Sequence, residues 1–256
     1  MTLSPDPTVF RSRLIAGDKL MGTFVKMPTT QAIEILGGVG FDFVVIDQEH
    51  APLDRRDIDL MCLAARASGM APVVRVGDQG DANVLSALDC GALGVMFPHT
   101  TSAATARDFV ARCRYAGGKR GFAGLTRASG WGKYPGPQHT AKQDSEIAVI
   151  AMIEDVPAVP EVPAICATEG IDAIFIGRGD LGASFGNDPD AAAKVAEIAE
   201  RIAADTRAAG TTLMMLANNV ADAAKMRSIG TSAMLVASDH NFLKSAATSA
   251  LKDYSA

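Results

Sequence analysis

The sequence predicts an α/β fold, a (β/α)8 TIM barrel that occupies residues 1–256 as a single domain. Eight short apolar runs of strand character alternate with helical patterns along the chain. Eight strands, each followed by a helix, are the number that closes such a barrel, and 256 residues are a usual length for one. Because 48% of the residues are apolar, the chain can supply the large core that this fold requires.

The expected strands are runs of β-branched and other apolar residues that are too short to form helices. The run at Phe43–Asp47 is typical, since a parallel strand with both faces covered is apolar almost throughout. In chain order the expected strands are Met21–Lys26, Phe43–Asp47, Ala71–Arg75, Gly94–Phe97, Ile147–Ile153, Ala173–Ile176, Thr212–Leu216 and Ser232–Val236.

The expected helices carry apolar residues at helical spacing, and a glycine often follows the last turn, where a left-handed residue ends the helix. In chain order they are Thr30–Gly37, Arg56–Ser68, Asp81–Asp89, Ala103–Arg114, Ala158–Thr168, Ala191–Ala208, Val220–Ser228 and Asn241 to about Asp253. The pattern of the last helix is compatible both with a place in the outer ring of the barrel and with packing across a subunit interface.

A long segment at 115–145 interrupts the alternation between the fourth helix and the fifth strand. Loops of this length in a compact domain are usually functional or disordered. The segment holds Trp131, the only tryptophan of the chain, and several cations, which favours a lid or a subunit contact. A solvated insertion is the alternative.

Composition and charge argue against several classes of partner and site. The net charge of -5 disfavours nucleic acid, because binding phosphates requires a basic face. No segment resembles a membrane span, and the first residues carry no apolar core of secretory length, so we expect a cytoplasmic protein. The four cysteines are widely spaced without a C-x-x-C pair, and we expect them to be small buried residues rather than metal ligands or disulfides.

The most informative stretch runs from Phe43 to Pro52. Asp47, Glu49 and His50 follow its apolar residues directly. Parallel strands of a barrel bring the residues at their C-terminal ends to one face, where barrel enzymes have their active sites. The alternative is that the two acids cap the next helix and His50 lies on the surface, but a cap requires only one polar side chain.

Other strand ends add charged residues to the same face. Arg75 ends the third expected strand, where a cation usually has an anion to hold. Glu154 and Asp180 follow the fifth and sixth strands, and we expect them side by side with no histidine next to them. Two carboxylates plus waters are typical of a hard divalent ion such as Mg²⁺ or Mn²⁺, and the open positions suit a chelating 2-oxo acid. The alternative is that Glu154 caps the next helix and Asp180 starts another.

The stretch Gly177–Gly182 reads GRGDLG and formally matches the dinucleotide motif G-x-G-x-x-G. It follows the sixth strand rather than the first, so we expect no organic cofactor. We interpret its glycines as positions where backbone approaches a ligand closely. Backbone N–H groups around Gly179 and Asp180 are expected to meet a substrate carboxylate.

The remaining residues near strand ends are less informative. His99 follows the fourth strand and can either reach the site or be structural, while His139 and His240 are expected on the surface. Lys26 is the one lysine at a strand end. Leu216 ends the seventh strand and is expected to contact the substrate.

Four motifs occur in order at the ends of successive expected strands: IDQEHAP at 46–52, VVRV at 73–76, MIED at 152–155 and IGRGDLG at 176–182. Together with KRGFAG at 119–124 and RASGW at 127–131, they resemble the HpcH/HpaI family of metal-dependent class II pyruvate aldolases over nearly the whole chain. The family includes lyases of aromatic catabolism. The resemblance therefore implies a carbon–carbon lyase on a TIM barrel.

The resemblance implies specific roles. Glu154 and Asp180 match the metal ligands, His50 matches the catalytic base, paired with Asp47, and Arg75 matches the arginine that holds the keto oxygen of the substrate. The implied ion is Mg²⁺, Mn²⁺ or Co²⁺. The implied reaction is reversible cleavage of 4-hydroxy-2-oxo acids, through an enolate that the ion stabilises, to an aldehyde and pyruvate or a related 2-oxo acid.

Three positions depart from the family pattern. Met152 replaces a common glutamine, Arg178 replaces the usual proline, and Phe24 stands where a tryptophan can line the aldehyde pocket. These changes leave the reaction type intact and the aldehyde preference open. We expect Glu49 to support the site by pairing with Arg75 or with a water on the metal.

Other functions remain open at this point. A Schiff-base aldolase would use Lys26 as its amine, and an acyl-CoA lyase would need a basic site for which the Lys119–Arg120 pair is the one candidate. A non-catalytic barrel would bind a metabolite or a partner protein. The resemblance further implies a homo-oligomer, usually a hexamer, whose sites are completed by a neighbouring subunit.

Overall fold

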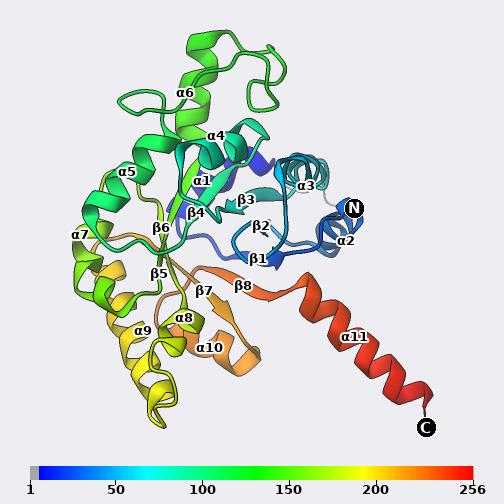
Figure 1. The fold of residues 1–256 in the computed structure, drawn as a ribbon, viewed down its shortest axis with the longest axis vertical. Helices are drawn as coiled ribbons and strands as arrows, with labels where there is room; N and C mark the ends of the chain where they lie inside the picture. Colours follow the sequence, from blue (N-terminus) through cyan, green and yellow to red (C-terminus); the bar gives the residue numbers. More distant parts are fainter. Residues whose placement is uncertain (1–5, 256) are drawn as a thin grey trace.

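The computed structural model describes residues 6–255, so residues 1–5 and 256 of the predicted domain lie outside the described residues. The chain forms a closed barrel in which each strand pairs in parallel with the next and β8 pairs with β1 (Figure 1). The strands are β1 (Leu20–Val25), β2 (Phe43–Asp47), β3 (Ala71–Arg75), β4 (Gly94–Phe97), β5 (Ala148–Ile153), β6 (Ala173–Ile176), β7 (Thr212–Ala217) and β8 (Ala233–Ser238). The predicted TIM-type α/β barrel is thereby confirmed.

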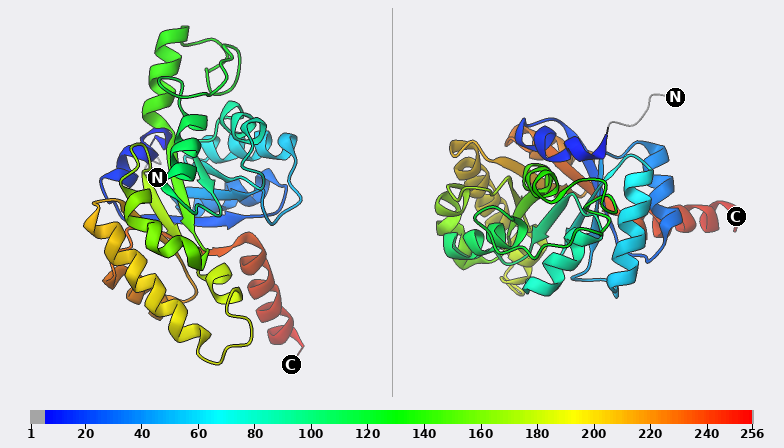
Figure 2. Two further views of the ribbon diagram at one scale, coloured as in Figure 1. Left: turned by 60° about the vertical axis from the view of Figure 1, so that its left-hand side comes forward. Right: turned by 90° about the horizontal axis from the view of Figure 1, so that it is seen from above.

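Most helices lie around the outside of the barrel (Figure 2). They are α2 (Thr30–Val39), α3 (Arg55–Ala67), α4 (Asp81–Asp89), α5 (Ala103–Cys113), α7 (Val162–Cys166), α9 (Ala191–Ala208) and α10 (Val220–Ser228). Side chains fix several of their starts: Asp54 and Asp57 form a reciprocal capping box on α3, and Ser102 caps α5. The four cysteines are buried and free, as expected.

The core has two apolar layers, one inside the barrel and one between the strands and the helices. A short helix that the sequence patterns did not predict, α1 (Phe10–Ile15), closes the N-terminal end of the barrel. Its Phe10 ring lies 5.2 Å from the ring of Phe43, and the hydroxyl of Thr212 donates to the carbonyl of Leu14 at 2.6 Å. The C-terminal end of the barrel stays open for a site.

The helix predicted at Ala158–Thr168 is divided. A 3-10 helix, η2 (Val156–Glu161), precedes α7, because Pro157, Pro160 and Pro163 remove backbone donors that one continuous α-helix needs. The last predicted residues, Ala167 and Thr168, lie beyond the end of α7.

The long segment at 115–145 is also not a loop throughout. Its second half forms α6 (Gly136–Glu146), which stands away from the barrel (Figure 1). The expectation that His139 lies on the surface is wrong: the residue is 1% exposed, because its ring packs against Phe122 and its Nε2 lies 3.1 Å from the hydroxyl of Tyr115. His240 is exposed, as expected.

The last helix, α11 (Asp239–Tyr254), does not complete the outer ring. It leaves β8 and projects from the barrel, and Asp239 is its one buried residue (Figure 1). Its apolar side chains are largely exposed, with Leu243 60% and Leu251 71% accessible. Across residues 6–255, no helix combines the length and apolarity that a bilayer crossing requires.

Candidate active site

A cavity of about 580 Å³ opens at the C-terminal ends of the strands. It brings together side chains that are far apart in the sequence, as expected for this face of a barrel. Among its lining residues are six of the predicted ones: Phe24, Arg75, Glu154, Gly179, Asp180 and Leu216. Asp47, Glu49 and His50 do not line the cavity. Asp47 contacts the lining residues Arg75 and Lys26, Glu49 contacts Arg75, and the His50 ring lies next to Glu49.

One side of the site is built around the ion pair between Asp47 and Arg75, which are register partners on the neighbouring strands β2 and β3. Arg75 donates from Nε to Oδ1 at 2.9 Å and from a terminal nitrogen to Oδ2 at 2.7 Å, and Lys26 Nζ lies 3.0 Å from Oδ2. Burial opposes the charge of Asp47, but the hydrogen bonds and charge of Arg75 outweigh it and lower the pKa of this carboxyl. The Phe24 ring stacks on the guanidinium at 4.9 Å.

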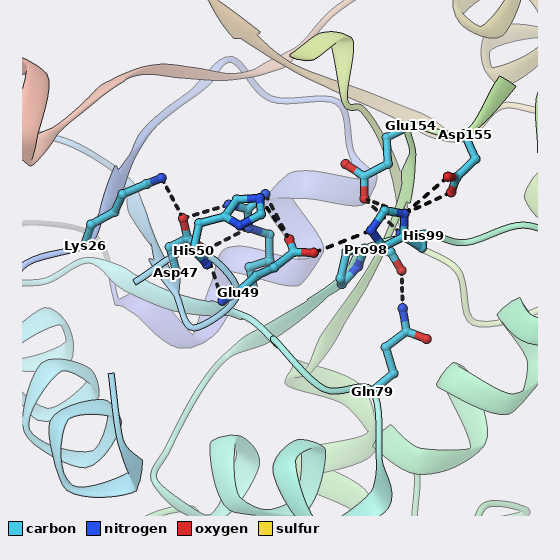
Figure 3. A network of polar contacts seen from close by, with 10 residues as sticks. Lys26, Asp47, Glu49, His50, Gln79, Pro98, His99, Glu154 and Asp155 are labelled. Carbon is cyan, nitrogen blue, oxygen red and sulfur yellow. Dashed lines mark hydrogen bonds and ion pairs between the residues drawn. The ribbon is translucent and has the colours of Figure 1, made fainter. Parts of the chain in front are cut away.

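The turn after β2 presents Glu49 and His50 (Figure 3). The carboxylate of Asp47 accepts the backbone N–H groups of both residues at 3.2 Å. Asp47 therefore holds the main chain of His50, whereas the imidazole lies nearer to Glu49, with 3.9 Å between Nε2 and Oε2. The ring is half exposed at the rim of the site. Glu49 lies 3.2 Å from Arg75, the pairing expected from the sequence.

Glu154 follows β5 and is 2% exposed. Its Oε1 accepts the backbone N–H of His99 at 2.9 Å, and its Oε2 is buried with no hydrogen-bond partner among the described residues. Burial, with smaller contributions from Asp180 and Glu49 against the opposing effect of His99, raises the pKa of Glu154 to about 7. The expectation that no histidine lies beside the two acids is wrong, because the turn after β4 folds back over β5.

His99 adopts the left-handed backbone region, with φ at 51°. Its ring Nδ1 lies 3.1 Å from Oδ2 of Asp155 and 3.7 Å from Oε1 of Glu154. Burial lowers the pKa of His99, but Asp155 and Glu154 outweigh it, so the net shift is upward. The ring thus stands among three carboxylates, including Glu49 at 3.7 Å from Nε2.

Asp180 lies in α8 (Arg178–Ala183), a single short turn that follows β6. The chain passes close to Glu154 here, and a Cβ on Gly177 would come within 2.5 Å of its Oε2. At Gly177 the absence of a side chain therefore leaves room for the carboxylate of Glu154, and an approach of this backbone to a ligand stays a prediction. Nothing lies within 4 Å of a Cβ built on Gly179, which lines the cavity.

The residues present fit a divalent ion. Donor atoms of Glu49, His99 and Glu154 lie within 4.8 Å of one another, and the orphaned oxygen of Glu154 is the atom that a cation would satisfy. Asp180 lies outside this group of donors, but it lines the same cavity as Glu154. Carboxylate oxygens suit Mg²⁺ and Mn²⁺, and an imidazole nitrogen beside them suits a transition ion such as Co²⁺.

Two supporting contacts were not predicted. Arg178 pairs with Asp222 at 2.6 Å and donates to the carbonyl of Leu216 at 2.6 Å, which ties α8 to the turn after β7. Asp239, which follows β8, accepts the backbone N–H groups of Lys26 and Met27 at 2.9 Å. Asp239 follows a strand directly, so the rule that located Asp47 and Glu154 also applies to it.

A closed parallel barrel with buried acids, a clamped arginine and two histidines at its C-terminal face has the arrangement of a barrel enzyme. The comparisons with known proteins give its class. Residues 20–246 match the sequence model of the HpcH/HpaI aldolase/citrate lyase family. The chain belongs to this family.

Similar proteins carry related names. A hydroxypyruvate/pyruvate aldolase of Roseovarius nubinhibens is 35% identical over 239 residues, 92% of each chain. One of Paraburkholderia phytofirmans is 36% identical over 251 residues, 95% of this chain and 96% of the other. The crystal structure of an HpcH/HpaI aldolase/citrate lyase family protein of Burkholderia cenocepacia matches with a TM-score of 0.89 at 31% identity, over 97% of this chain and 100% of that one. The protein is a carbon–carbon lyase.

Proposed function

We propose that the protein catalyses the reversible, divalent-metal-dependent aldol cleavage of 4-hydroxy-2-oxo acids to an aldehyde and pyruvate or a related 2-oxo acid. One observation carries the proposal. A buried glutamate with an orphaned oxygen, Glu154, shares a cavity with Asp180 and with the clamped Arg75. Aldolases of pyruvate and hydroxypyruvate among the relatives support 2-oxo acid chemistry.

Glu154 and Asp180 are the residues that would hold the ion. When bound, Mg²⁺, Mn²⁺ or Co²⁺ supplies Lewis-acid stabilisation of the negative charge that develops on the keto oxygen. The buried carboxylate of Glu154 favours a cation strongly, because burial destabilises its charged form unless an opposite charge lies beside it. The backbone around Gly179 is open to the cavity and can donate N–H groups to the carboxylate of the substrate.

Arg75 is proposed to donate to the keto oxygen. Its bonds to Asp47 and its contact with Glu49 fix the guanidinium before substrate arrives, which is what electrostatic catalysis requires. Lys26 holds the other side of Asp47. This network holds the guanidinium of Arg75 in place before the reaction, whereas an unpaired arginine would have to be oriented during it.

His50 is proposed to move the proton. In cleavage it takes the proton of the 4-hydroxyl, the C3–C4 bond breaks, the aldehyde leaves, and the electron pair of that bond forms the enolate. Protonation at C3 then gives pyruvate. The half-exposed ring at the rim can exchange its proton with solvent between turnovers. Phe24 and Leu216, which line the cavity, are proposed to contact the aldehyde part.

The exposed apolar surfaces are proposed to contact other copies of the chain in a homo-oligomer, a hexamer by family resemblance. On α11 these side chains are Leu243, Leu251 and Tyr254, and the segment 115–145 adds Phe122 and Trp131 as a lid or subunit contact. Light scattering after gel filtration tests this proposal. Leu243→Asp should lower the mass of the particle, and an unchanged mass would contradict a role of α11 in assembly.

The assay for the reaction is pyruvate release from 4-hydroxy-2-oxo acids, followed with lactate dehydrogenase. We expect release to stop after chelation with EDTA and to return when single divalent ions are restored. Undiminished release in EDTA, or trapping of pyruvate on Lys26 by borohydride, would favour a Schiff-base aldolase instead. The pairing of Lys26 with Asp47 argues against that reading, because an ammonium held by a buried carboxylate is not a nucleophile.

A further inference from the structure

We propose that His99 is a ligand of the divalent ion, so that the site combines an imidazole nitrogen with carboxylate oxygens. The inference rests on the proposed function, which supplies the ion. The starting observation is the group of donors on Glu49, His99 and Glu154, which lie within 4.8 Å of one another. These residues come from the turns after three different strands, β2, β4 and β5, that meet at one point (Figure 3).

The orientation of the ring leaves one nitrogen available. Nδ1 lies 3.1 and 3.3 Å from the two carboxylate oxygens of Asp155, a contact that favours the tautomer with the proton on Nδ1. Nε2 then carries a lone pair and lies 3.7 Å from Oε1 of Glu49. A carboxylate on the far nitrogen is the usual setting of a histidine that ligates a metal. Two donors at about 2.1 Å from one ion are at most about 4.2 Å apart, so this separation fits a shared ion.

The second observation concerns the two carboxylate oxygens of Glu154. The backbone N–H of His99 donates to Oε1 of Glu154, while Oε2 is buried and has no hydrogen-bond partner within residues 6–255. Glu154 is 2% exposed, so burial disfavours its charged form, and a cation is the natural partner of that oxygen. His99 therefore orients the carboxylate of Glu154 through its backbone N–H and brings a ring nitrogen beside it.

The backbone of His99 indicates that this placement is enforced. Its φ of 51° is rare for a residue with a side chain and costs on the order of 1 kcal/mol. The turn is held on both sides of His99: the carbonyl of Pro98 accepts from the side chain of Gln79 at 2.5 Å, and the N–H of Thr100 donates to the carbonyl of Met152 at 3.1 Å. A structural turn would use glycine or asparagine here more cheaply.

An imidazole ligand changes which ion the site prefers. Magnesium binds oxygen donors almost exclusively, whereas affinity for mixed nitrogen and oxygen sites increases from Mn²⁺ to Co²⁺. Substitution of His99 should therefore lower the affinity for Co²⁺ much more than the affinity for Mg²⁺. If His99 had a purely structural role, the substitution would lower the affinity for all ions to the same extent.

The test compares the wild-type protein with His99→Asn and with His50→Asn as the matched control. Asparagine tolerates the left-handed backbone, so the first variant keeps the turn. Calorimetric titrations with Mg²⁺ and Co²⁺ give affinities, and pulsed electron paramagnetic resonance of the Mn²⁺-loaded protein detects a bound nitrogen. We expect a ¹⁴N coupling in the wild type and in His50→Asn, its loss in His99→Asn, and a fall in Co²⁺ affinity of about 10- to 100-fold in that variant.

A ¹⁴N coupling that persists in His99→Asn, or that is absent from the Mn²⁺-loaded wild type, would overturn the inference. Equal weakening of Mg²⁺ and Co²⁺ would do the same. These outcomes leave the proposed function intact as long as chelation still abolishes pyruvate release. A wild-type protein that binds no divalent ion and releases pyruvate in EDTA would instead overturn the proposed function.

Discussion

The substitution Glu154→Gln should stabilise the metal-free protein at high pH. Burial raises the pKa of Glu154 from 4.5 to about 7. The folded protein therefore holds this proton more tightly than the unfolded chain does. Ionisation of Glu154 lowers the free energy of unfolding progressively as the pH rises from about 4.5 to 7. At about 1.4 kcal/mol for each pKa unit, the full penalty above pH 7 is at most about 3 kcal/mol. Glutamine keeps the shape and has no charge to bury.

The assay is urea unfolding in EDTA at pH 8 and at pH 5. We expect the variant to exceed the wild type by up to about 3 kcal/mol at pH 8 and by much less at pH 5. Glu161→Gln makes the same chemical change at an exposed position and should have no such effect. Added Mn²⁺ should stabilise the wild type and not Glu154→Gln.

A difference of the same size at both pH values would refute this reasoning, because it would place the effect in packing rather than in a buried charge. Equal stabilisation of wild type and variant by Mn²⁺ would show that Glu154 does not hold the ion.

Three further predictions concern the rest of the site. His50→Ala should lower turnover by roughly two decades or more in the pyruvate-release assay, as expected for a positioned acid–base group, and a near-normal rate would contradict its role. Arg75→Met should lower the free energy of unfolding, measured in urea at pH 7, by about 3 kcal/mol, because the buried Asp47 would keep only Lys26 as a charged partner. A loss below about 1 kcal/mol would contradict the importance of the Asp47–Arg75 pair. Because protons compete for Glu154 and for the proposed ligand His99, affinity for Mn²⁺ should fall by at least about tenfold per pH unit below pH 7. A flat calorimetric profile would show that no proton is displaced.

The barrel could be predicted because its strands obey a simple rule. A strand covered on both faces is apolar along its length, and β2, β3, β4 and β6 have the predicted bounds. The rule fails where local chemistry competes with pattern. Three prolines divide the helix expected at 158–168. Most residues of α6 are polar, such as Gln138 and Lys142, so no apolar helical pattern predicts this helix.

The site could be predicted to the level of which residues meet. Fold geometry alone brings the residues after β2, β3, β5 and β6 to one face, so Asp47, Arg75, Glu154 and Asp180 gather as expected. Contacts set by turn conformation could not be predicted. The φ of 51° at His99 turns its N–H and ring towards Glu154, and no periodic pattern encodes that angle.

The same limit applies to side chains that pair across turns. The sequence predicts that Asp47 and His50 act together, but the carboxylate accepts the backbone N–H of His50 because only two residues of a tight turn separate them. Arg178 and Asp222 are far apart in the chain, and their pairing depends on the exact positions of α8 and α10.

Hydrogen–deuterium exchange into the methyl group of pyruvate, followed by proton NMR in D₂O, tests enolate formation without knowledge of the aldehyde. The site proposed here predicts rapid exchange with the wild type and a divalent ion, and loss of exchange in EDTA and in Glu154→Gln. Exchange that continues undiminished in thoroughly chelated protein would contradict the assignment of Glu154 and Asp180 as the residues that hold a catalytic cation.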